Sequence, residues 1–186
     1  MKTVPLNRSH LKGAVELHRA ARPWCYRGRD AAYVLRAFYD AYANRDYTVG
    51  TAGLEGGRVV GLACGTTNPA GPAEWLRRRR PWRSWAARVA GGTGMALGGW
   101  GRELFAAAGA QGRVAYLLAA VTAEGLSEGD VATMFDFFAA AASSRGASRI
   151  YAPAAAPDER LLKVGFEPTE GFASREGAPL LYVRGL

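Results

Sequence analysis

The sequence has little cysteine, little lysine and no long apolar run. Its two cysteines, Cys25 and Cys64, can form at most one bridge, which excludes a disulfide framework. No apolar stretch reaches the roughly 18 residues that a membrane-spanning helix needs. The first residues, 1–5, lead into a polar segment and lack the apolar core of a signal peptide. We therefore expect a cytoplasmic protein without a transmembrane segment.

Histidine is equally scarce. His10 and His18 are eight positions apart, and no cysteine or carboxylate pattern accompanies them, so we expect no metal site. Cys64 ends an apolar segment and has no neighbouring histidine in the sequence. We interpret it as a small core residue and not as a nucleophile.

The composition is that of an ordinary globular protein, with 186 residues, 49% hydrophobic and 22% charged. This excludes extensive disorder, and the length predicts a single domain over residues 1–186. The net charge is +8, and 21 of the 24 basic residues are arginine. Seven arginines against Glu74 and Glu103 give residues 67–111 a charge of +5. The basic surface is therefore local.

Hydrophobic periodicity predicts a mixed, mostly antiparallel sheet flanked by helices. The order is strand, two helices, a hairpin, an insertion, then alternating strands and helices and a final hairpin, which is typical of an α/β domain. The predicted strands are residues 3–6, 46–54, 58–66, 113–122 and 148–151 with a hairpin in 166–183; the predicted helices begin near Asn7 or Ser9, Asp30, Ser127 and Asp158.

Three stretches carry a resemblance to a known family. Residues 161–166, Leu-Leu-Lys-Val-Gly-Phe, are similar to a motif in which a short helix ends in Gly-Phe before the sixth strand. Residues 114–135 are similar to a long fourth strand followed by a third helix. Residues 36–39 and 57–61 are similar to a second helix and a strand hairpin. Together they resemble the GNAT superfamily of acyl-CoA-dependent N-acetyltransferases over nearly the whole chain.

The resemblance implies an activity and a place for it. In that family, acyl-CoA lies where the fourth and fifth strands separate, and its pyrophosphate lies against the third helix's N-terminus, where N–H groups and the helix dipole favour anions. This implies transfer of an acyl group from acetyl-CoA or another acyl-CoA to an amine of a small-molecule acceptor. The implied binding residues are Val121, Thr122, Ser127 and Gly129.

The sequence departs from the family at the pyrophosphate. The family pattern is Arg/Gln-x-x-Gly-x-Gly/Ala, and of residues 126–131 only Gly129 keeps it. Glu128 and Asp130 place two carboxylates where a dianion would lie. Ser127-x-x-Asp130 is also close to a capping box, in which the protein's own side chains take the N–H groups that a phosphate would use.

Two further positions differ. Ala154 stands where the family often has asparagine, and Leu161 stands where a tyrosine commonly protonates the leaving thiolate. Leucine cannot donate a proton. These differences keep an alternative open, a GNAT-fold biosynthetic enzyme that no longer uses acetyl-CoA and catalyses a cyclisation, a decarboxylation or a similar reaction. A non-catalytic ligand-binding protein is a third reading.

Candidate residues for the reaction come from two places. Tyr116 and Glu124, near the two ends of the central strand, are the polar groups best placed for proton transfer; in the alternative, Tyr116 packs and Glu124 is solvated. Trp24, Tyr26 and Tyr33 lie on the side where the resemblance places the acceptor, and they either stack on it or pack in the core.

The insertion, residues 67–112, is rich in arginine, tryptophan and glycine. Trp82 and Trp85 have helical spacing beside the arginines 77–80. Such a segment fits weak contact with an anionic membrane surface, contact with nucleic acid, or a lid or homodimer contact. We favour the lid or dimer contact and expect no specific nucleic acid, because similar family members use this place in that way.

Overall fold

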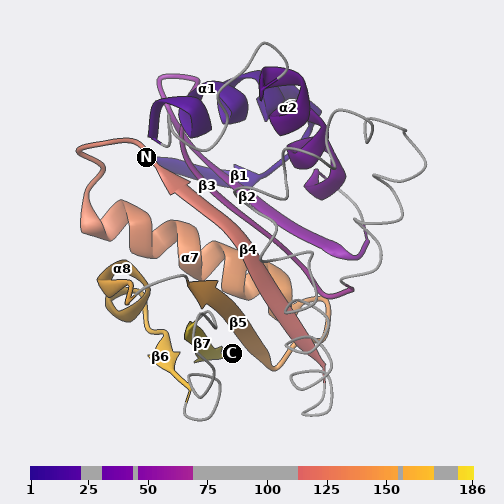
Figure 1. Cartoon of the computed structure of the whole chain (residues 1–186), viewed down its shortest axis with the longest axis vertical. Helices are drawn as coiled ribbons and strands as arrows, with labels where there is room; N and C mark the ends of the chain where they lie inside the picture. The colour runs from indigo at the N-terminus through magenta and orange to yellow at the C-terminus, as the bar shows by residue number, and fades with distance from the viewer. Residues whose placement is uncertain (22–30, 44–45, 69–112, 155–156, 170–179) are drawn as a thin grey trace.

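The structure is a computed structural model that describes residues 1–21, 31–43, 46–68, 113–154, 157–169 and 180–186. These residues form one seven-stranded sheet with the order β1-β2-β3-β4-β5-β7-β6, in which only β4 and β5 run parallel (Figure 1). The mixed, mostly antiparallel sheet predicted above is confirmed. The strands are β1 (Lys2–Pro5), β2 (Thr48–Glu55), β3 (Arg58–Thr66), β4 (Val114–Thr122), β5 (Arg149–Ala154), β6 (Glu167–Pro168) and β7 (Leu180–Gly185); the helices are the 3-10 turn η1 (Arg8–His10), α1 (Leu11–Ala21), α2 (Ala31–Tyr42), α7 (Glu128–Ser143) and α8 (Glu159–Lys163).

Three predicted helix caps and the predicted turn lie where the sequence places them, while the predicted cap Asp30 lies outside the described residues. Asn7 caps η1, which leads directly into α1, while Ser127 caps α7 and Asp158 caps α8. Gly56 and Gly57 connect β2 to β3 with φ of 54° and 80°, a conformation in which other residues are strained. Local side-chain and backbone chemistry therefore sets these boundaries.

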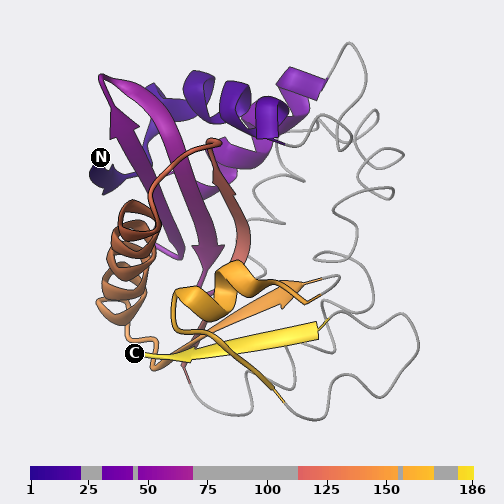
Figure 2. The same ribbon diagram turned by 90° about the vertical axis from the view of Figure 1, so that its left-hand side faces the viewer.

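The helices cover both faces of the sheet. α7 packs on one face, and α1 and α2 pack on the other (Figure 2). Alternation along the strands gives each face its own core, because successive side chains of a strand point to opposite sides. The core on the α7 face includes Met134, Phe135, Phe138, Ile150, Phe166 and Tyr182; the core on the other face includes Leu6, Leu11, Leu35, Tyr39, Tyr42 and Leu62.

β4 and β5 separate partway along their length. Their parallel ladder joins Val114 to Arg149 at one end and Tyr116 to Tyr151 at the other, where it stops. β5 continues beside β7, and β4 continues beside β3, so the two strands diverge (Figures 1 and 2). We call this divergence the fork and its last joined pair, Tyr116 and Tyr151, the vertex. Just beyond the vertex, Leu118 is an extra residue in the β3–β4 ladder, a β-bulge.

Several predictions fall outside the described residues. These include residues 69–112 of the predicted insertion 67–112, the loop 22–30 and the turn within 170–179. In the part of the chain that the structure describes, no helix combines the length and the apolar character needed to cross a bilayer.

Candidate functional site

The vertex is a pair of buried tyrosines. Tyr116 on β4 and Tyr151 on β5 are 2% and 4% exposed, and their ring centroids are 6.4 Å apart with the planes tilted by 30°. Both side chains point away from α7, to the face that carries α1 and α2, and pack with Val114 and Leu181. Burial, with a smaller contribution from Tyr151, raises the pKa of Tyr116 to about 12. Tyr116 is therefore a neutral phenol at every physiological pH.

A close approach of two strands supports the vertex. Gly65 on β3 lies opposite Leu117, beside the bulge. A Cβ at this glycine would lie 2.0 Å from the carbonyl oxygen of Tyr116 and 2.7 Å from the ring of Phe138 on α7. Only glycine allows β3, β4 and α7 to meet at this distance, so Gly65 fixes the backbone of Tyr116.

The other end of the fork faces the start of α7. Ser127 Oγ accepts a hydrogen bond from the Asp130 N–H at 3.1 Å and donates one to Asp130 Oδ2 at 2.7 Å. The predicted cap is therefore confirmed, but the carboxylate accepts from the serine hydroxyl and not from the serine N–H as in a full capping box. Among the described residues, nothing accepts the N–H groups of Glu128 and Gly129.

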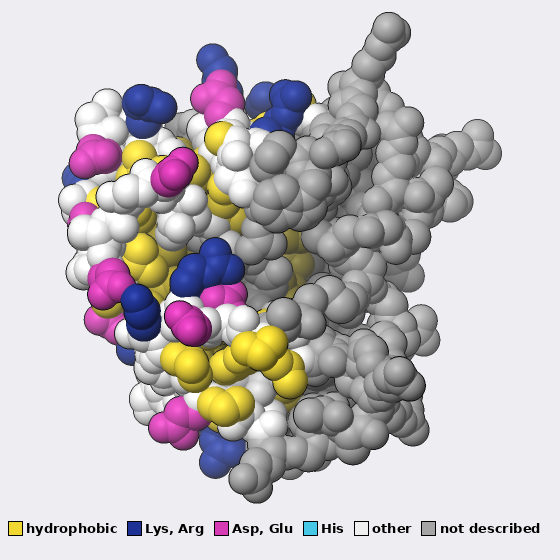
Figure 3. Space-filling view, turned by 60° about the vertical axis from the view of Figure 1, so that its left-hand side comes forward, with side chains coloured by type: hydrophobic (Ala, Val, Ile, Leu, Met, Phe, Trp, Pro, Cys, Tyr) yellow, Lys and Arg dark blue, Asp and Glu magenta, His cyan; other side chains and the backbone are white. Residues whose placement is uncertain are grey.

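Each carboxylate at this helix start has a cation beside it. Lys163 Nζ of α8 lies 2.5 Å from Glu128 Oε1, and the α-amino group of Met1 lies 3.0 Å from Asp130 Oδ1. The hydrogen bond from Lys163 lowers the pKa of Glu128, and hydrogen bonds from Ser127 and the α-amino group lower the pKa of Asp130. Both carboxylates are ionised, yet the charges are balanced, in line with the mixed acidic and basic side chains of Figure 3.

The helix start fits a phosphate better than its sequence indicates. Two N–H groups point out of the first turn, and no atom lies within 4 Å of a Cβ added to Gly129. Lys163 supplies a positive charge beside them, and it offsets the repulsion expected from Glu128. The Ser127 cap occupies the N–H group of Asp130 and not those of Glu128 and Gly129. The residues present are thus compatible with the phosphates of an acyl-CoA.

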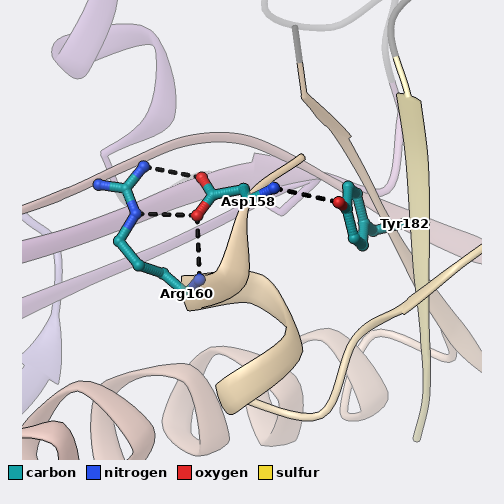
Figure 4. Close-up of polar contacts among 3 residues, drawn as sticks. All are labelled: Asp158, Arg160 and Tyr182. Atoms are coloured by element: carbon teal, nitrogen blue, oxygen red, sulfur yellow. Dashed lines mark hydrogen bonds and ion pairs between the residues drawn. The ribbon is translucent and has the colours of Figure 1, made fainter. Parts of the chain in front are cut away.

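The start of α8 is occupied by the protein's own side chains (Figure 4). Asp158 accepts from the backbone N–H of Arg160 at 3.1 Å and forms a two-pronged ion pair with its guanidinium at 2.9 and 2.7 Å. The Asp158 N–H donates to Tyr182 Oη at 3.1 Å. Leu161 is 7% exposed in the α7-side core. This helix therefore presents no phenol where the resemblance expects a tyrosine.

The structure separates the predicted reaction residues. Tyr116 lies at the vertex, while Glu124 is exposed beyond the other end of β4. An extended strand rises about 3.3 Å per residue, so the eight positions between them span roughly 25 Å. The two cannot act on one atom. Trp24 and Tyr26 lie outside the described residues; Tyr33 belongs to α2, and its side chain is also outside them.

The predicted acyl-donor residues lie along the path from the vertex to α7. Val121 is buried in the α1–α2 core, so it can offer only its backbone, and Thr122 is half-buried. Ser127 and Gly129 are exposed at the helix start. They line one strand and one helix end, the arrangement that the resemblance implies.

Sequence reasoning missed two residues of this site. Tyr151 joins Tyr116 only through the parallel ladder, and its isolated strand segment gives no sign of that partner. Lys163 reaches Glu128 across 35 positions of sequence. Its rarity, as one of three lysines in an arginine-rich chain, is the signal that could have singled it out.

The remaining predictions concern metals and nucleophiles. Cys64 is fully buried in the α1–α2 core, and burial raises the pKa of its thiol, which agrees with a core role. His18 is 4% exposed, more buried than expected, and Tyr39 Oη lies 2.6 Å from its Nδ1 and provides a hydrogen-bond partner for that nitrogen inside the core. Within the described ranges, no three potential ligands gather as a metal site would require.

Comparison with known proteins gives the fold a name. No family model and no curated protein sequence matches the chain. Among solved structures, an aminoglycoside 6'-acetyltransferase type Ii superimposes over 100% of this chain and 97% of its own, with a TM-score of 0.61 at 13% identity. The PaiA N-acetyltransferase from Thermoplasma acidophilum, in complex with coenzyme A, has a TM-score of 0.61 at 9% identity, and the match covers 100% of this chain and 98% of its own. The GNAT domain of S. lividans PAT has a TM-score of 0.58 at 14% identity, and the match covers 99% of this chain and 89% of its own. The chain therefore has the fold of the GNAT superfamily.

Proposed function

We propose that the protein transfers an acyl group from a CoA thioester to an amine of a small-molecule acceptor. The observation that carries the proposal is the fork, with a helix start at its open end whose Glu128 and Gly129 N–H groups are available among the described residues. The similar structures include one in complex with coenzyme A. A bound thioester supplies the activated carbonyl; the chain holds it and excludes water.

The two ends of the fork have different tasks in this proposal. At the α7 end, the N–H groups of Glu128 and Gly129, together with Lys163, bind the phosphates. The backbone of Val121 and Thr122 holds the chain that connects the phosphates to the thioester. Ser127 keeps the first turn of α7 in place through its bond to Asp130.

The acceptor approaches the vertex from the face that carries α1 and α2. Trp24, Tyr26 and Tyr33 remain predicted contacts for it, on the resemblance alone. Of the two residues predicted for proton transfer, only Tyr116 lies at the vertex. Glu124 remains a prediction from the sequence.

Calorimetric titration of acetyl-CoA into the full chain tests this proposal at moderate salt, because low salt would let the arginine-rich segment of the sequence attract any polyanion. We expect a dissociation constant in the micromolar range. Gly129→Val fills the space beside the two N–H groups and should weaken binding at least tenfold. Gly185→Val, at an equally open position on β7, is the matched control and should bind as the wild type does.

Absence of binding at millimolar acetyl-CoA would overturn the proposal. It would favour the enzyme that has abandoned acetyl-CoA. If binding is present, release of free thiol in the presence of amines of different charge identifies the acceptor class. Equal loss in both glycine variants would contradict a site at the start of α7.

A further inference from the structure

Acyl transfer needs a group that stabilises the negative charge developing on the thioester carbonyl oxygen. Leu161 is a core residue of α8, and Glu124 is exposed at the far end of β4. Among the described residues, Tyr116 and Tyr151 are the polar side chains that the fold brings to this point.

The position of the two tyrosines is set by the strand register. They are directly opposite each other in the last pair of the β4–β5 ladder. The fork opens immediately beyond them, so a thioester lying between the strands reaches the vertex along the plane of the sheet. Their side chains lie on the α1–α2 face, from which the acceptor approaches.

The described surroundings of Tyr116 favour hydrogen bonding over ionisation. Val114 and Leu181 complete a small cluster with the two tyrosines, and Leu118 of the bulge packs against it. Such an apolar environment strengthens a hydrogen bond to a developing charge, because water does not compete for it. The high pKa of Tyr116 keeps its proton in place over the working pH range.

We propose that Tyr116 donates a hydrogen bond to the thioester carbonyl oxygen of the acyl donor, and that Tyr151 is a positioning residue that holds the Tyr116 phenol at the vertex. This rests on the proposed acyl transfer. The amine nitrogen attacks the carbonyl carbon and a C–N bond forms. The carbonyl oxygen then carries the negative charge that Tyr116 stabilises.

The reaction step needs no further reagent. When the C–S bond breaks, the sulfur leaves with the electron pair and takes up the proton that the amine nitrogen loses. Tyr116 keeps its own proton from start to end. Its role is therefore electrostatic. It differs from that of the tyrosine that commonly protonates the leaving thiolate in the family, where this chain has Leu161.

The test uses the ketone analogue of acetyl-CoA, in which a methylene group replaces the thioester sulfur, labelled with 13C at the carbonyl. A hydrogen bond to this carbonyl moves its resonance downfield, and the measurement needs no acceptor. We expect a downfield shift on wild-type protein that Tyr116→Phe removes and Tyr151→Phe reduces. Tyr182→Phe, a buried tyrosine on the opposite face of β7, is the matched control and should keep the full shift.

Turnover gives the second readout once an acceptor is known. Tyr116→Phe should lower kcat about 100-fold to 1000-fold, as loss of one such hydrogen bond does, with acetyl-CoA affinity within twofold of the wild type. The double variant with Tyr151→Phe should fall no further than Tyr116→Phe alone. Binding of the analogue by all variants with the same carbonyl shift would overturn this inference and leave the acyltransferase proposal standing. No binding of acetyl-CoA to the wild type would overturn both.

Discussion

The two ends of the fork are built by different physics, although one strand of nine residues, β4, connects them. At the vertex, Tyr116 and Tyr151 are buried and held by packing. At the start of α7, Glu128 and Lys163 are exposed, charged and held by an ion pair in water. Packing leaves little room for relaxation, whereas exposed charges are screened by solvent. Substitutions at the vertex should therefore have large effects, and substitutions at the helix start small ones.

The largest effect is expected for Gly65→Ala. The new Cβ would lie 2.0 Å from the Tyr116 carbonyl oxygen, a backbone atom that cannot move without breaking the β3–β4 ladder. We expect a loss of about 3 kcal/mol in the free energy of unfolding, at the upper end of overpacking effects. Chemical denaturation followed by circular dichroism measures it.

Gly129→Ala is the matched control at the other end of the fork. Here a Cβ meets open space, and alanine is the better helix former, so stability should rise by roughly 0.5 kcal/mol. The contrast in sign is the prediction. A similar change in both variants would mean that the vertex relaxes as easily as the helix start.

These two glycines also show how far the sequence can predict the fold. Local signals were sufficient for the caps at Ser127 and Asp158 and for the turn at Gly56, because each depends on residues a few positions away. Gly65, in contrast, is one glycine of an apolar strand. Its need for glycine comes from the Tyr116 carbonyl oxygen, on a strand about 50 positions later, and from Phe138, on a helix more than 70 positions later.

The candidate site follows the same division. Its α7 end could be predicted, since Ser127, Glu128 and Gly129 are neighbours whose capping chemistry is local. The vertex could not, because Tyr116 and Tyr151 meet only after β4 and β5 align in parallel, and α7 lies between them in sequence. The same holds for Lys163, which neutralises Glu128 from another helix. Reasoning from neighbours alone therefore overestimated the repulsion at the helix start.

An intermediate effect is expected from alkaline pH. The pKa of Tyr116 lies near 12 in the folded state and near 10 in model peptides, so the folded protein keeps this proton longer than the unfolded chain. Its contribution to stability is complete below pH 10 and is lost as the pH rises toward 12. The free energy of unfolding should fall more steeply over this window in the wild type than in Tyr116→Phe.

Tyr151→Phe sharpens this measurement. Tyr151 contributes the smaller part of the upward shift in the pKa of Tyr116, after burial. Removing its hydroxyl should therefore reduce the pH dependence only partly, to a slope between those of the wild type and Tyr116→Phe. If the free energy of unfolding depends on pH equally in Tyr116→Phe and in the wild type, the Tyr116 phenol is solvated. The vertex would then not differ from the exposed start of α7 in the way argued above.

The smallest effect is expected for Glu128→Gln. Glutamine keeps the shape of the side chain but leaves the charge of Lys163 unbalanced beside the Glu128 and Gly129 N–H groups. Acetyl-CoA should bind about threefold more tightly, the scale of one exposed charge near an anion, and added salt should reduce the gain. Glu167→Gln is the matched control, since it removes the same charge from an exposed position on β6. Equal tightening in both variants would trace the effect to net charge, whereas a gain confined to Glu128→Gln places the phosphates at the start of α7.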